Sequence, residues 1–145
     1  MIALAAFISL LSAQGDVAPA PAADEVVQAA LNAHNAHDLD AFLASMADDV
    51  TFLSLDGDVL VTGRDRVAEI WGARFEAHPE LVADITHRTV IGNRVIDEEQ
   101  LCLDGRGHPC VELVAIYTVE GGLIQTMHVI QPAPASGPSE SGDAQ

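Results

Sequence analysis

Apolar residues recur at helical spacing in the first half of the chain and at alternating positions in the second half. Three helices are predicted, each with one apolar face. The first begins near Asp24, which can cap it, and is interrupted at residues 35–37. The second follows Asp38 as a cap, carries Met46 on its apolar face and ends at Asp48-Asp49. The third covers residues 64–77, and His78-Pro79 ends it because proline disfavours helix at the preceding residue.

Alternating patterns separated by turn residues predict six strands. Two are short and join through Asp56-Gly57-Asp58, and four longer ones fill the chain after the third helix. The predicted strands are Val50–Leu55, Val59–Thr62, Leu81–Ile91, Arg94–Leu103, Val111–Val119 and Leu123–Gln131. This order predicts an α+β domain, with three helices packed on one face of a curved, mostly antiparallel sheet. Such a cone has its mouth between the helices and the sheet.

The two ends differ in composition from this domain, which we place at residues 24–131. Residues 1–23 contain the apolar run Ile2–Leu11 and an Ala/Pro linker, which together are typical of a secretory signal peptide. They predict a periplasmic or secreted protein, the alternative being a cytoplasmic one. Residues 132–145 are rich in Pro, Ser and Gly and predict a disordered tail.

Charge excludes several classes of function. The chain of 145 residues has 22 acidic side chains against six arginines and no lysine, a formal net charge of −16. This charge excludes an ordinary nucleic-acid-binding protein, because nucleic-acid binding needs a cationic face. It also disfavours binding to anionic membrane surfaces, which repel a protein with this charge. The run Ile2–Leu11 is also too short for a membrane span, which needs about 20 residues.

Several segments carry a resemblance to a known family. They are VVQAALNAHNAHDLDAFLASMADDVTF, TGRDRVAEIWGARF, the phrases HPELVADI and VIGNRVIDEE, and the finish GGLIQTMHVI. The chain resembles the SnoaL-like, ketosteroid-isomerase-like branch of the nuclear transport factor 2 (NTF2-like) superfamily. That resemblance implies the cone fold, a pocket for a small hydrophobic molecule, a homodimer, and chemistry that needs neither a cofactor nor a metal.

The isomerase's own catalytic residues do not carry over. Its helix tyrosine falls on Ala30, its base on Ser54, and its oxyanion aspartate near Ala115. Ala30, Ser54 and Ala115 cannot replace these groups, since the isomerase needs an ionised Asp as the base and acidic side chains as donors to the oxyanion. The resemblance therefore implies that this chain is no ketosteroid isomerase by that mechanism.

Trp71 and Arg74 lie three residues apart on the apolar stripe of the third helix. A cation on such a face needs a carboxylate or a ligand. Three interpretations of Arg74 are possible: it forms a structural ion pair that closes the cone, it lines the pocket and orients a ligand, or it is exposed at the rim. We take Asp97 as its partner. Other candidate carboxylates are Glu98, Glu99 and Glu112, and alternation puts Asp97 and Glu99 on one face.

Other candidate site residues come from the late strands. Tyr117 is predicted to point inward with Leu113 and Ala115, either to a ligand or to the core. The family implies that Met127 faces inward, which turns His128 to the outer face, where relatives dimerise. If His87 faces inward it is the best available general base, because imidazole titrates near pH 6.5. Pocket residues are therefore predicted to be Trp71, Arg74, Tyr117 and Met127, and acid–base residues His87 and Asp97.

One pair of histidines is a candidate metal site, and one pair of cysteines is a candidate disulfide. His34 and His37 lie three residues apart, but a predicted helix break separates them and no third ligand has a suitable spacing, so we expect both at the surface. Cys102 and Cys110 flank a predicted hairpin loop, where directly opposed residues can form a disulfide. In an exported protein that disulfide is expected. In a cytoplasmic one the two residues remain thiols.

Two functions remain open at this stage. One is proton transfer or water addition on a small hydrophobic molecule, in the manner of an isomerase, cyclase or hydrolase. The other is a non-catalytic module that binds such a molecule, or a dimer whose cavity is filled by its own side chains.

Overall fold

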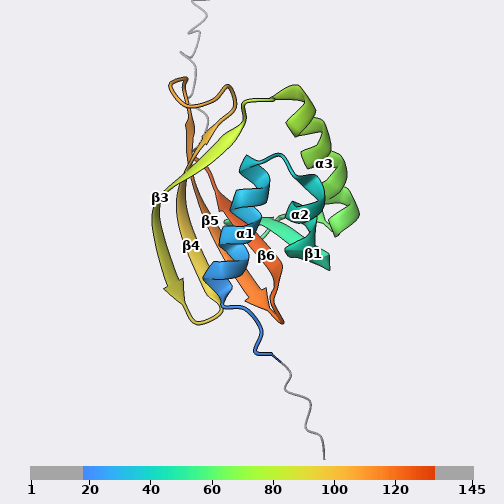
Figure 1. The fold of residues 1–145 in the computed structure, drawn as a ribbon. Helices are drawn as coiled ribbons and strands as arrows, with labels where there is room; N and C mark the ends of the chain where they lie inside the picture. Colours follow the sequence, from blue (N-terminus) through green and yellow to red (C-terminus); the bar gives the residue numbers. More distant parts are fainter. Residues whose placement is uncertain (1–17, 133–145) are drawn as a thin grey trace, which may run out of the picture.

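Three helices cover one face of a six-stranded sheet in the computed structural model, which describes residues 18–132 (Figure 1). The helices are α1 (Ala23–Asn35), α2 (Leu39–Ala44) and α3 (Arg64–Ala77). The strands are β1 (Met46–Ser54), β2 (Val59–Thr62), β3 (Val82–Ile91), β4 (Arg94–Cys102), β5 (Val111–Glu120) and β6 (Leu123–Ile130). The predicted α+β class and element order are confirmed. Residues 1–17 of the predicted signal segment and linker lie outside the described residues, as does the predicted tail beyond its first residue, and Ala23 belongs to α1.

The strand order is β2-β1-β6-β5-β4-β3, and every neighbouring pair is antiparallel except β1 with β6. This one parallel pairing makes the sheet mixed. It also inserts the last strand of the chain between the early β1–β2 hairpin and the meander β3–β5. No helix within residues 18–132 is long and apolar enough to cross a membrane.

Helix ends follow specific hydrogen bonds more closely than apolar spacing. Asp38 caps α2 as predicted, accepting a hydrogen bond from the Ala41 N–H at 3.0 Å. Residue 22 rather than Asp24 precedes α1, and its N–H donates to the Glu25 carboxylate at 3.0 Å. Helix α2 ends before Met46, because the Ser45 carbonyl accepts from the Ile124 N–H and the chain joins β6 there. Met46 therefore opens β1 instead of extending the helix.

The hydrophobic core lies between the helices and the sheet. Its centre is an aromatic cluster in which Trp71 packs edge-on against Phe52 at 5.3 Å and tilted against Phe42 at 5.8 Å. Val67 and Phe75 extend the same buried face of α3. Helix α3 thus places its apolar stripe over β1 and β2, while α1 crosses the opposite part of the sheet, over β3 to β6.

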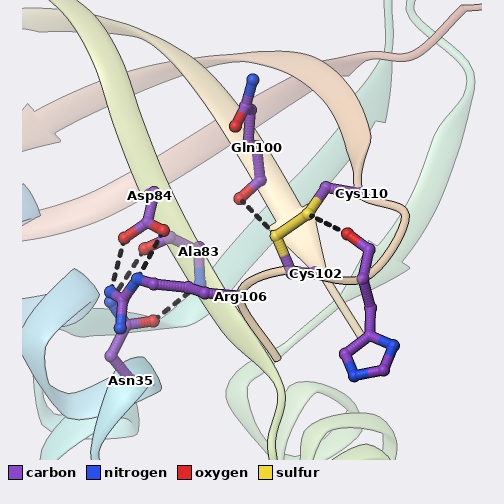
Figure 2. The surroundings of a disulfide bond; sticks show 8 residues. Asn35, Ala83, Asp84, Gln100, Cys102, Arg106 and Cys110 are labelled. Atoms are coloured by element: carbon purple, nitrogen blue, oxygen red, sulfur yellow. Dashed lines mark hydrogen bonds and ion pairs between the residues drawn. A yellow bond between two sulfur atoms is a disulfide. The ribbon is translucent and has the colours of Figure 1, made fainter. Parts of the chain in front are cut away.

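A disulfide joins Cys102 and Cys110 at the base of the β4–β5 hairpin (Figure 2). The loop it closes carries Arg106, whose guanidinium binds both oxygens of Asp84 on β3 at 2.6 and 2.7 Å. One residue earlier on β3, the backbone of Ala83 exchanges two hydrogen bonds with the side chain of Asn35. Figure 2 shows these contacts together: the loop, through Arg106, and the end of α1, through Asn35, both hold the start of β3.

Candidate functional site

A cavity of about 670 Å³ lies inside the cone, within the 300–1,000 Å³ range of small-molecule sites. Its wall is mainly apolar, with contributions from all three helices and from the sheet. The polar side chains on the wall are His34, Ser54, Asp56, Arg74, Glu99, Tyr117 and Gln131. All four predicted pocket residues, Trp71, Arg74, Tyr117 and Met127, line it.

Arg74 does not pair with Asp97, contrary to the prediction. Its guanidinium carbon lies 4.8 Å from the centroid of the Trp71 ring, a cation–π contact along one helix face. Among residues 18–132, no carboxylate forms an ion pair with it. Helix α3 packs on β1 and β2, whereas Asp97 lies on β4, three strands further across the sheet.

Asp97 is held by Arg88 instead. The carboxylate is 1% exposed and receives two parallel hydrogen bonds from the Arg88 guanidinium, both at 2.7 Å. A third nitrogen of Arg88 donates to the Gln28 side chain of α1 at 2.8 Å. The carboxylate of Asp97 raises the pKa of Arg88 above its ordinary value. Asp97 is absent from the cavity wall and both its oxygens are engaged, so its position does not support the predicted acid–base role.

His87 points away from the cavity. It is exposed on β3, opposite the exposed Glu98, and its Nε2 is hydrogen-bonded to the Thr89 hydroxyl at 3.3 Å. A bulge between Ile85 and His87 causes this placement. Unbulged pairing would set His87 opposite Asp97; the extra residue gives that place to Arg88. The geometry gives no support to His87 as the general base.

Glu99 and Tyr117 form a hydrogen-bonded pair of titratable side chains on the cavity wall. Both line the cavity, Glu99 is 8% exposed, and the Tyr117 hydroxyl donates to Glu99 Oε1 at 3.0 Å. Tyr117 shares the inward face of β5 with Leu113 and Ala115, which also line the cavity, as predicted.

Burial sets the protonation of this pair. Desolvation raises the pKa of Glu99 to about 7, the negative charge of Asp97 adds to this, and the hydrogen bond from Tyr117 opposes it. Burial and the same two carboxyl groups raise the pKa of Tyr117 well above its ordinary value, so the phenol stays a donor. A carboxyl that titrates near neutrality in an apolar cavity can both take and return a proton. One indication that Glu99 is buried was present in the sequence, because alternation puts Glu99 and Asp97 on the same face of their strand.

His34 is buried, contrary to the surface position expected for it. It is 8% exposed, lines the cavity, and packs edge-on against Phe42 at 5.7 Å and Phe75 at 5.5 Å. Its Nδ1–H donates to the Asn35 side chain at 3.2 Å. Burial lowers its pKa, with smaller contributions from the charges of His37 and Arg74, so the neutral ring is favoured.

His37 is only partly buried and binds the backbone instead. Its Nε2–H donates to the Leu81 carbonyl at 2.8 Å and its ring stacks on Phe75. Nowhere in residues 18–132 do three His, Cys, Asp or Glu side chains gather to hold a metal ion.

The model of the SnoaL-like domain matches residues 27–127. The chain belongs to the SnoaL-like domain family. The three positions at which ketosteroid isomerase would carry its catalytic groups, Ala30, Ser54 and Ala115, all line the cavity of this SnoaL-like domain. The cavity is thus in the place expected from the family, while its titratable groups stand elsewhere on the wall.

Solved structures give the same fold for this SnoaL-like domain. An uncharacterised cystatin-fold protein from Novosphingobium aromaticivorans is 27% identical, with a TM-score of 0.69 over 77% of this chain and 99% of that one. An NTF2-like protein of unknown function from Cytophaga hutchinsonii is 17% identical, with a TM-score of 0.64 over 80% and 94%. A putative ketosteroid isomerase from Kribbella flavida is 18% identical, with a TM-score of 0.64 over 80% and 82%. No curated protein matches the chain.

Proposed function

We propose that this SnoaL-like domain binds a small, mostly apolar molecule in its cavity and transfers a proton on it, with Glu99 as the acid–base group. The observation that carries the proposal is the Glu99–Tyr117 pair on an otherwise mainly apolar wall. Ionised Glu99 takes a proton from an activated carbon or from water, and protonated Glu99 returns one. Tyr117 holds the carboxyl in place by its hydrogen bond. Isomerisation consists of such proton transfers, and ring closure and hydration each include one beside the bond that forms within the substrate or to water.

A second candidate is binding without catalysis, favoured by the side chains at positions 30, 54 and 115. Alanine and serine there offer no acid or base where the isomerase has one. The cavity would then hold its molecule through apolar contacts, and the buried carboxyl would serve as a polar anchor.

One experiment separates these candidates. Full-length protein is purified gently from its host and examined by native mass spectrometry with a panel of steroids, terpenes and polyketides. Any captured molecule is then incubated with the protein in D2O, and deuterium incorporation is followed by mass. We expect exchange whose rate rises as pH passes through about 7, because deprotonated Glu99 is the base.

Glu99→Gln removes the base while keeping an oxygen that can accept from Tyr117, so it should abolish this exchange. Glu98→Gln, on the exposed face of the same strand, is the matched control and should leave it intact. Capture without exchange, or equal exchange by both variants, would leave the binding function in place of catalysis. Capture of nothing across the panel would refute both.

The same spectra test a homodimer, which we propose forms through the outer face of the sheet, where His128 pairs with Ile116 across β6 and β5. We also propose export, and the disulfide supports it because such bonds persist in oxidising compartments. Amino-terminal sequencing of the native protein should then begin at or after Gln14, and an intact Met1 would refute cleavage.

A further inference from the structure

One cation on the cavity wall, Arg74, forms no ion pair among residues 18–132. Of the six arginines, four pair with carboxylates: Arg64, Arg66, Arg88 and Arg106. Arg94 is exposed beside the β3–β4 turn, where water solvates it. Arg74 is different, because it is half-buried, lines the cavity and has no carboxylate partner in the described part of the chain.

The donors around Arg74 point to what is missing. Its guanidinium is fixed over the Trp71 ring, which leaves N–H groups in a planar fork that matches a carboxylate. Within residues 18–132, the indole N–H of Trp71 is buried and has no acceptor. His34, on the same wall, is close enough for the charge of Arg74 to lower its pKa. Within the described residues, this part of the wall therefore combines a cation that has no ion-pair partner with a buried N–H that has no acceptor.

Glu99 belongs to the other side of the cavity. Helix α3, which carries Arg74, packs on β1 and β2, while Glu99 is on β4. Strands β1 and β4 are three strand spacings apart, roughly 14 Å across the sheet. Arg74 and Glu99 are thus carried by elements at different parts of the sheet, so an anion paired with Arg74 does not need to approach ionised Glu99.

We propose that the molecule bound here is an amphipathic carboxylic acid, whose carboxylate pairs with Arg74 and whose hydrocarbon body extends along the apolar wall toward Glu99. This inference rests on the proposed function, since it names the chemical class that the same cavity takes. It also fixes an orientation: the acid group is the anchor, and the opposite end of the molecule faces Glu99 and Tyr117. The net charge of −16 repels anions at long range, so selectivity for an acid must come from Arg74 itself.

The test compares acids with neutral molecules of the same skeleton on the full chain. Octanoate is measured against octan-1-ol, and 2-naphthoate against 2-naphthamide, by isothermal titration calorimetry at pH 8. We expect each acid to bind about tenfold to a hundredfold more tightly than its neutral analogue, as a charge-assisted hydrogen-bonded pair provides. Arg74→Gln should remove this preference by weakening the acids alone, and Arg74→Lys should restore part of it. Arg94→Gln, which removes an exposed arginine, is the matched control and should keep the preference.

The outcomes separate this inference from the proposed function. Equal affinity of acids and neutral analogues would overturn the inference and leave an apolar binding site. A preference for acids that survives Arg74→Gln would overturn it as well, because the anchor would be elsewhere. If no member of either pair binds and the wider panel is not captured, the binding function fails and the inference with it. The wild-type comparison stands even if an Arg74 variant fails to fold.

Discussion

Replacing Glu99 by glutamine should make the protein more stable at alkaline pH. The folded-state pKa of Glu99 is about 7, against 4.5 for an ordinary glutamate, so the folded state holds the proton more tightly than the unfolded one. The contribution of Glu99 to the free energy of unfolding is fully present below pH 4.5 and is lost as pH rises through 7. Each unit of pKa difference corresponds to about 1.4 kcal/mol. Between pH 5 and pH 9, ionisation of Glu99 should lower the free energy of unfolding of the wild type by about 2.5 kcal/mol. The glutamine variant cannot ionise at this position and should not show this loss.

The assay is urea denaturation at several values between pH 5 and pH 9, followed by the fluorescence of Trp71, the single tryptophan, which is 9% exposed. The quantity compared is the variant's free energy of unfolding minus that of the wild type. In this difference the pH-dependent contributions of the other acidic groups cancel, because both proteins share them. This difference should rise with a midpoint between pH 5 and 7 and level off above pH 8. Glu98→Gln, on the exposed face of the same strand, should give a flat difference. Parallel curves for wild type and Glu99→Gln would refute the buried, proton-binding carboxyl on which the proposed chemistry depends.

Three further outcomes follow from the contacts described. Arg88→Met should lower the free energy of unfolding by about 3–5 kcal/mol, because it leaves the buried carboxylate of Asp97 unpaired. Urea denaturation measures this loss, and Arg88→Met/Asp97→Leu should recover most of it; no recovery would contradict the reasoning. Reducing the disulfide of the β4–β5 hairpin should cost about 2.5 kcal/mol for so short a loop, and thiol titration of unreduced protein should find no free thiol in that hairpin. Tyr117→Phe removes the hydrogen bond that lowers the pKa of Glu99, so the midpoint of the pH-dependent stability should move to higher pH, and an unchanged midpoint would count against it.

Apolar periodicity sufficed to predict the helices, the strands and the inward face of β5. It placed Trp71, Arg74 and Tyr117 on the cavity wall, because each shares a face with neighbours that had to be buried, while the inward position of Met127 was implied by the family resemblance. Periodicity carries less information at element ends. The end of α2 depends on a hydrogen bond from a strand that lies far along the chain, and no local pattern contains it.

Ion pairing failed for a different reason. The partner of Asp97 depends on the register between β3 and β4, and a single bulge exchanges His87 for Arg88 opposite it. A one-residue change of register sends every following side chain to the other face. Residue types in a strand do not reveal such a bulge, so the sequence could predict a buried carboxylate and a cation but not which of the arginines it meets. The buried Glu99–Tyr117 pair was not predicted, for the related reason that the burial of Glu99 depends on three-dimensional packing.

The position of β6 has a consequence for how the chain folds. This strand lies between β1 and β5 and is their common neighbour, so the β1–β2 hairpin has no partner in the sheet until residues 123–130 are present. During synthesis, the early hairpin and the helices must wait with an apolar face uncovered while most of the domain is made. Contacts so distant in sequence also slow folding, because the intervening chain must be ordered before they form. Removing the last strand would therefore divide the sheet into two unconnected parts, where removing an edge strand would only narrow it.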